Sequence, residues 1–142
     1  MSVSTDPEIF SPSLAEINSG CQAELPPMAI RGLELFNGGE YFEAHEALET
    51  AWRAETRPIR ELYRGILQVG VAYYHIQRGN GRGALKMLQR CRRWLAPFPD
   101  SCCGIDLATF RQDFLQVQQQ LELAAENPAV ISEIVFKPIH FR

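Results

Sequence analysis

The spacing of helix-breaking residues limits this chain to a small set of folds. Proline and glycine recur between apolar segments, as "LPP" at 25–27, "GG" at 38–39, "GNG" at 79–81 and "ENP" at 126–128. Proline suits the first position of a helix and glycine suits the position after its end. No strand-like alternation of apolar and polar residues occurs before residue 129. The sequence therefore predicts an all-α protein with five helices, at about 27–37, 40–55, 59–78, 83–95 and 107–126.

The connections predict how these helices pack. The stretches "LFNGGEYFEAHEALE" and "YHIQRGNGRGALKML" each contain a helix end, a glycine turn and the start of another helix. Short connections of this kind place consecutive helices antiparallel and in contact. We therefore expect a compact bundle of about five helices, built from two packed helical hairpins plus a C-terminal helix.

The length of 142 residues fits one domain. Residues 1–24 mix small, polar and proline residues without periodicity, so we expect a flexible N-terminal arm there and a single helical domain over 25–142. Asp106 is the expected N-cap of the last helix, because an aspartate at this position accepts a hydrogen bond from the first turn. The tail from residue 129 is apolar enough to dock on the core, as either helix or strand.

Composition argues against several classes of partner and compartment. The net charge of −3 predicts no nucleic acid or anionic membrane as a partner, and no stretch of about 18 apolar residues predicts a membrane span. The three arginines of "QRCRRW" at 89–94 are interpreted as part of a solvated face. The four cysteines, Cys21, Cys91, Cys102 and Cys103, lack CxxC spacing, so we expect free thiols in a cytoplasmic protein.

The helix predicted over 40–55 carries a histidine and glutamates in an otherwise apolar pattern. At about 100° per residue, His45, Glu49, Trp52 and Phe42 fall within one third of the helix circumference. Alanines form a separate face suited to the close approach of another helix, and this face could also serve a homodimer. We expect the aromatic arc to be buried, with His45 and Glu49 at its centre in a buried polar network, so Glu49 needs a cation, a donor, a metal or a proton of its own.

The next helix is apolar except for one polar stripe. Glu61, Arg64, Gln68 and His75 fall within a narrow arc of its circumference. This stripe either faces water or lies opposite His45 and Glu49. In the second case we expect Arg64 to neutralise Glu49 or Glu46, and His75 to supply a second imidazole.

Several segments resemble, in order, the family known as domain of unknown function 309. They are "LFNGGEYFEAHEALETAWR", "RGILQVGVAYYHIQRGNGRGALKML" and "PFPDSCCGIDL". The core signature of that family, H-E-x-x-E-x-x-W, fits His45, Glu46, Glu49 and Trp52 of this chain. The resemblance covers about residues 28–110. Membership implies a compact all-α fold and implies no established activity.

The signature leaves an enzymatic alternative open. H-E-x-x-E differs from the H-E-x-x-H of zinc peptidases by a glutamate in place of the second histidine. A metal-dependent hydrolase would use His45 and Glu49 as ligands of a divalent metal ion and Glu46 as the base. An acid–base pair of His45 with Glu49 is a further alternative, but no nucleophile is placed beside it, so no catalytic residue is assigned.

A second alternative is an interaction module. The first hairpin resembles a tetratricopeptide unit, and Tyr63, Tyr73 or Tyr74 could line a groove for a partner helix. The leading hypothesis is a small non-enzymatic binding or accessory module without a cofactor, serving an unknown small ligand or protein partner. Its expected polar pocket, between the helices at 40–55 and 59–78, comprises His45, Glu46, Glu49, Trp52, Arg64, Gln68 and His75.

Overall fold

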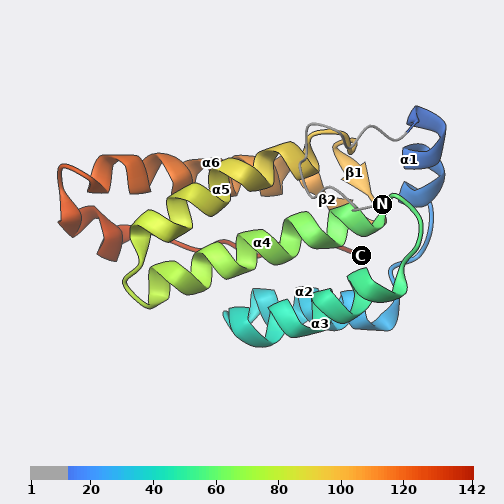
Figure 1. Ribbon diagram of the computed structural model, residues 1–142, viewed down its shortest axis with the longest axis horizontal. Helices are drawn as coiled ribbons and strands as arrows, with labels where there is room; N and C mark the ends of the chain where they lie inside the picture. The colour runs from blue at the N-terminus through green and yellow to red at the C-terminus, as the bar shows by residue number, and fades with distance from the viewer. Residues whose placement is uncertain (1–12) are drawn as a thin grey trace, which may run out of the picture.

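The computed structural model describes residues 13–142, and α-helices dominate this part of the chain (Figure 1). The predicted all-α class is confirmed, and the predicted helix bounds agree with the structure to within about two residues. The elements are α1 Leu14–Cys21, α2 Pro27–Asn37, α3 Tyr41–Ala54, α4 Arg60–Gln77, α5 Gly81–Leu95, β1 Ser101–Cys102, β2 Ile105–Asp106, α6 Leu107–Ala124 and the 3-10 helix η2 Pro128–Glu133.

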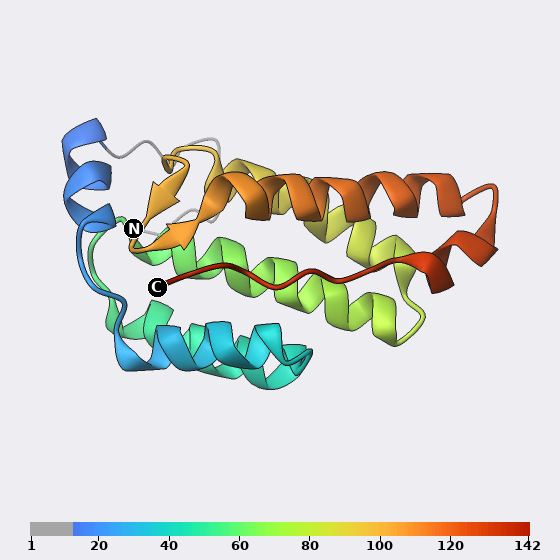
Figure 2. The ribbon, with the colours of Figure 1, turned by 180° about the vertical axis from the view of Figure 1, so that it is seen from behind.

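The helices form two layers. Figure 1 shows α3, α4 and α5 side by side, with α4 in the middle. Figure 2, seen from the opposite side, shows α2, the C-terminal tail and α6 in front of them. The pairs α2–α3 and α4–α5 are the two predicted hairpins. Their turns use glycines with positive φ, at Gly39 (φ 78°) and Gly79 (φ 81°), a conformation that glycine adopts without steric cost. None of the helices in residues 13–142 is both long and apolar enough to cross a membrane.

Side chains cap α5 and α6, as they do α1. The side chain of Asn80 accepts a hydrogen bond from the Gly83 N–H at the start of α5. Asp106 accepts from the N–H and from the hydroxyl of Thr109, which confirms it as the N-cap of α6. These hydrogen bonds favour the ionised carboxylate and lower the pKa of Asp106.

An aromatic cluster joins the two layers. The Phe36 ring of α2 contacts Tyr41 of α3, Tyr73 of α4 and Phe110 of α6 at centroid distances of 5.1, 5.6 and 6.0 Å. Phe136 of the tail adds a fifth ring, 4.8 Å from Tyr73. Helices α2, α3, α4 and α6 and the tail therefore meet in this cluster.

The C-terminal tail docks as an extended segment. After η2 it runs back along the bundle between α2 and α6 (Figure 2). The Asn37 amide exchanges two hydrogen bonds with the backbone of Ile139, at 2.9 and 2.7 Å, and Phe141 pairs with Ile105 of β2. The alternative that the sequence left open is thus resolved as mainly extended, with one short 3-10 helix.

The part of the expected N-terminal arm that the structure describes, residues 13–24, contains helix α1. Residues 1–12 of that arm lie outside the described residues. Ser13 and Glu16 form a capping box at the start of α1, and Ile17 is buried against the bundle. The sequence pattern concealed this helix because only one apolar side chain of α1 reaches the core.

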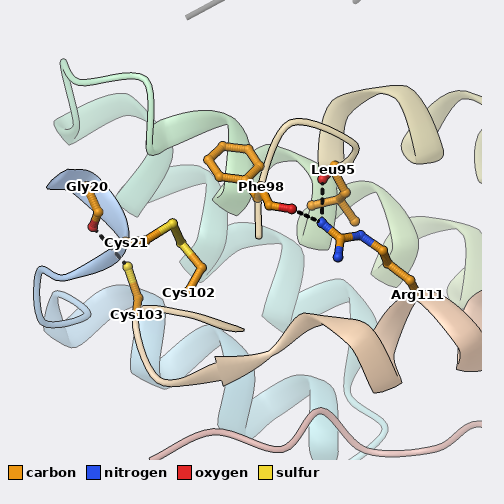
Figure 3. The surroundings of a disulfide bond; sticks show 7 residues. All are labelled: Gly20, Cys21, Leu95, Phe98, Cys102, Cys103 and Arg111. Carbon is orange, nitrogen blue, oxygen red and sulfur yellow. Dashed lines mark hydrogen bonds between the residues drawn. A yellow bond between two sulfur atoms is a disulfide. The ribbon is translucent and has the colours of Figure 1, made fainter. Parts of the chain in front are cut away.

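The expectation of four free thiols is also wrong. Cys21, at the end of α1, and Cys102, in β1, form a disulfide (Figure 3). Cys91 and Cys103 are free and buried. Sequence spacing could not reveal the pair, because the two cysteines are 81 residues apart and meet only when α1 docks beside β1.

We predict that Gly65→Ala destabilises the protein by about 1–3 kcal/mol, the usual cost of overpacking. A Cβ at Gly65 would lie 2.5 Å from a methyl carbon of Leu95, so α4 and α5 would have to separate. Chemical denaturation with circular dichroism measures the change.

Gly70→Ala in the same helix is the matched control. Its Cβ would lie 3.4 Å from the nearest ring atom of Phe36, which leaves room for a methyl group. Because alanine favours a helix interior by about 1 kcal/mol over glycine, this variant should be neutral or stabilised. Equal destabilisation by both changes would contradict a specific close contact at Gly65.

Candidate functional site

The structure divides the predicted polar pocket into two separate groups. In the first group, His45 Nε2 lies 3.3 Å from Glu49 Oε2, and Arg53 pairs with the other carboxylate oxygen of Glu49. His45 and Glu49 therefore contact each other, as predicted. Arg64 and Glu46 do not take part in this group, so the predicted neutralisation of a glutamate of α3 by Arg64 is wrong.

The His45–Glu49 pair is also more exposed than the helical pattern indicated. Their side chains are 32% and 31% exposed. The face of α3 that packs on α2 and α4 is the alanine face, with Ala44, Ala47 and Ala51 buried. The aromatic arc lies at the rim of this contact, because alanines allow the closest approach between helices. An ion pair at such a rim contributes about 0–1 kcal/mol to stability.

The second group is a stack of arginines and tryptophans between α3, α4 and α5. The Arg64 guanidinium lies 4.0 Å from the ring centre of Trp94 and 5.4 Å from that of Trp52. Arg60 covers the Trp52 ring at 4.4 Å and donates a hydrogen bond to the Trp52 carbonyl oxygen at 3.4 Å. Guanidinium groups stack well on tryptophan because they are planar and weakly hydrated. This stack joins the three helices of the front layer.

Arg64 has an acidic partner on its own helix. Its Nη1 lies 3.4 Å from Glu61 Oε2, and the two side chains are only 18% and 10% exposed. The buried Nε1 of Trp52 has no hydrogen-bond partner among the described residues. Arg64 thus balances the charge of Glu61 and bridges two indole rings, which is a structural role.

The remaining predicted residues are dispersed. Gln68 accepts a weak hydrogen bond from the Cys91 thiol at 3.8 Å, and His75 lies beside Tyr74 near the end of α4. Glu46 is exposed. Within residues 13–142, no three His, Cys, Asp or Glu side chains converge as metal ligands would, so the alternative site on His45 and Glu49 lacks a third protein ligand.

Five surface cavities lie away from these residues. Five cavities of about 240 to 400 Å³ occur on the described surface, and none is lined by any residue of the predicted pocket. Two of them flank α1, beside the Cys21–Cys102 disulfide and beside Arg57. The residues of the predicted pocket therefore line none of these five cavities.

One side of α5 carries a row of exposed cations, called here the basic face of α5. Arg82, Lys86 and Arg90 of α5 are exposed, and they follow one another at four-residue spacing along one side of the helix. None of them forms an ion pair with a described residue, and α5 contains no acidic residue. The four-residue spacing of these cations is visible in the sequence, whereas their exposure depends on how α5 packs.

We predict that Arg64→Met destabilises the protein by about 2 kcal/mol or more, because it leaves the buried Glu61 carboxylate without its cation. Glu49→Gln should cost less than about 1 kcal/mol, since its partners lie at an exposed rim. Urea denaturation of both variants checks this order.

A double variant separates charge balance from stacking. Adding Glu61→Gln to Arg64→Met should recover part of the loss, because no charge then remains buried. If Glu49→Gln proved the more damaging substitution, the buried interaction would lie at the His45 pair instead.

Comparisons with known proteins agree with the resemblance seen in the sequence. Residues 29–87 match the model of a family described as Domain of unknown function (DUF309), a range shorter than the 28–110 expected. An uncharacterized protein of Aquifex aeolicus is 29% identical over 77 residues, which are 54% of this chain and 23% of that protein.

A second relative covers more of the chain. The uncharacterized protein YpuF of Bacillus subtilis is 30% identical over 98 residues, which are 67% of this chain and 56% of YpuF. The chain thus spans about a quarter of one relative and about half of the other. The matched range contains α3, α4 and the first half of α5, with the whole signature from His45 to Trp52. The similarity to the DUF309 family therefore extends over residues 29–87 of this chain.

Proposed function

We propose that this protein is a non-enzymatic binding module that docks an acidic segment of a partner protein on the basic face of α5. The supporting observation is the charge distribution. Residues 60–95, which form α4 and α5, carry eight of the fourteen lysines and arginines of the chain and one acidic residue, Glu61. The chain as a whole has a net charge of −3, so this region is a local concentration of positive charge. Positive charge of this kind attracts acidic groups.

The spacing of the cations suits an acidic helix. Four residues of a helix rise about 6 Å, so Arg82, Lys86 and Arg90 present three positive groups along about 12 Å. Glutamates at four-residue spacing on an opposing helix would meet them at the same intervals, as oppositely charged flanking positions do in coiled coils. Because these cations are exposed and unpaired with described residues, docking would not require breaking an existing ion pair.

Two features favour a protein partner over a nucleic acid. Single-stranded nucleic acids bind through aromatic rings on which bases stack, but the Trp52 and Trp94 rings are already covered by arginines. Exposed acids also lie near this layer, with Glu43 and Glu46 on α3. A long phosphate backbone extending beyond α5 would be repelled by such groups.

No observation favours the other candidate functions to the same degree. Tyr63 and Tyr73 are 2% and 0% exposed, so they are core residues and line no docking groove. Of the three tyrosines considered, only Tyr74 reaches the surface in part. For a hydrolase, the His45–Glu49 pair lacks a third protein ligand among the described residues, and Glu49 is already paired with Arg53.

Charge reversal on α5 tests the proposal. The probe is a fluorescein-labelled poly-L-glutamate peptide, and the readout is fluorescence anisotropy at increasing salt. We expect binding by the wild type that weakens as salt rises, because exposed charges are screened. Lys86→Glu with Arg90→Glu should weaken binding by about tenfold or more, which corresponds to about 1.4 kcal/mol.

The matched control reverses two cations elsewhere. Arg31→Glu with Arg142→Glu changes the net charge equally but leaves α5 intact, and both side chains are exposed. Its affinity should stay close to wild type. Equal losses of affinity in both variants would show that only the net charge matters, and would contradict a site on α5. Tighter binding of an oligothymidine than of the peptide would contradict a protein partner.

A further inference from the structure

We propose that the Cys21–Cys102 disulfide is a reducible latch that holds α1 over Cys103, and that its reduction opens Cys103 as a site of thiol modification. This inference is independent of the binding role of α5. It follows from four features at one end of the bundle: a short helix, a disulfide, a buried third thiol and two cavities (Figure 3).

The first feature is the weak attachment of α1. The helix has eight residues, of which only Ile17 and Gly20 are buried, and Leu14 is 72% exposed. A cavity of about 370 Å³ lies at its C-terminal end, and another of about 310 Å³ lies between it and Pro58. An isolated helix of this length is unstable in water, so α1 depends on its attachment to the bundle.

The second feature is that α1 directly holds the third cysteine. The Cys103 N–H donates to the Cys21 carbonyl oxygen at 2.7 Å, and the Cys103 thiol donates to the Gly20 carbonyl oxygen at 3.3 Å. Both acceptors belong to the last turn of α1, as Figure 3 shows for the thiol. Cys103 itself has a positive φ of 52°, which is an uncommon conformation for a residue with a side chain. Release of α1 removes both hydrogen bonds that support this conformation.

The third feature is the unequal exposure of the two cysteines of the disulfide. Cys102 is 1% exposed, whereas Cys21 is partly exposed and lines the larger cavity with Cys103. The thiolate of an external dithiol therefore reaches the Cys21 sulfur and displaces Cys102 as the leaving thiolate. The second thiol of the reductant then attacks the mixed disulfide. Two electrons pass to the protein, both cysteines become thiols and the reductant becomes a disulfide.

The fourth feature is the protection of Cys103 while the latch is closed. Burial raises the pKa of the Cys103 thiol to about 11, so at neutral pH the group is protonated and a poor nucleophile. The nearby Glu55 carboxylate also raises this pKa, while Arg57 opposes the shift. When α1 leaves, the thiol gains solvent and its pKa falls towards the ordinary value, so the thiolate fraction at neutral pH rises.

The test compares oxidised protein with protein reduced by tris(2-carboxyethyl)phosphine. Hydrogen exchange followed by mass spectrometry reports the amides of α1, and a short pulse of iodoacetamide reports each cysteine. We expect reduction to speed exchange in residues 14–21 and alkylation of Cys103 by tenfold or more. Exchange in α4 should be unchanged. Cys91, a buried thiol on α5, is the internal control and should stay unmodified in both states.

A double variant tests the latch without a reductant. Cys21→Ser with Cys102→Ser should show the fast exchange and the fast Cys103 alkylation under oxidising conditions, with unchanged far-ultraviolet circular dichroism. Slow exchange in α1 after complete reduction would overturn the latch. So would simultaneous alkylation of Cys91, which would indicate global unfolding, or peptide mapping that finds Cys21 paired with Cys103.

Discussion

The close packing of α4 against its two neighbours is the constraint on which the rest of the fold depends. α4 lies between α3 and α5, and its small residues permit both contacts (Figure 1). Gly65 admits the Leu95 side chain of α5, and Ala72 is fully buried. On the opposite side, the alanines of α3 face this helix and α2. Small residues on facing surfaces bring the helices close enough for the larger side chains around them to fill one core.

This packing also determines which polar groups remain at the surface. Because the alanine face of α3 is buried, His45 and Glu49 are displaced to the rim, where water screens their interaction. Arg64 and Glu61 lie deeper, between helices, and there the arginine stacks on two indole rings. The signature from His45 to Trp52 thus contains both the exposed His45–Glu49 pair and Trp52, which stacks on the arginines of α4. Arg82, Lys86 and Arg90 of α5 remain exposed and belong to neither group.

The disulfide stabilises the fold in a different way from the core packing. It joins residues 81 apart in the sequence, and closing a loop of that size reduces the entropy of the unfolded chain by the equivalent of about 4 kcal/mol. Its structural effect is local, because α1 has few other buried contacts. The C-terminal tail is attached differently, through the Asn37 amide and the Phe136 ring. One terminal segment therefore depends on a covalent bond and the other on packing and hydrogen bonds.

The sequence by itself determined the helices from α2 to α6, because prolines, glycines and caps such as Asp106 act on the nearest few residues. It also identified His45 and Glu49 as a contacting pair, since i and i+4 positions are neighbours on any helix. Only the tertiary structure decided which face of α3 is buried, that Arg64 turns to Trp94, and that Cys21 meets Cys102. Those outcomes depend on contacts between residues distant in sequence. The helical period shows which residues share a face, but it does not show which element packs against that face.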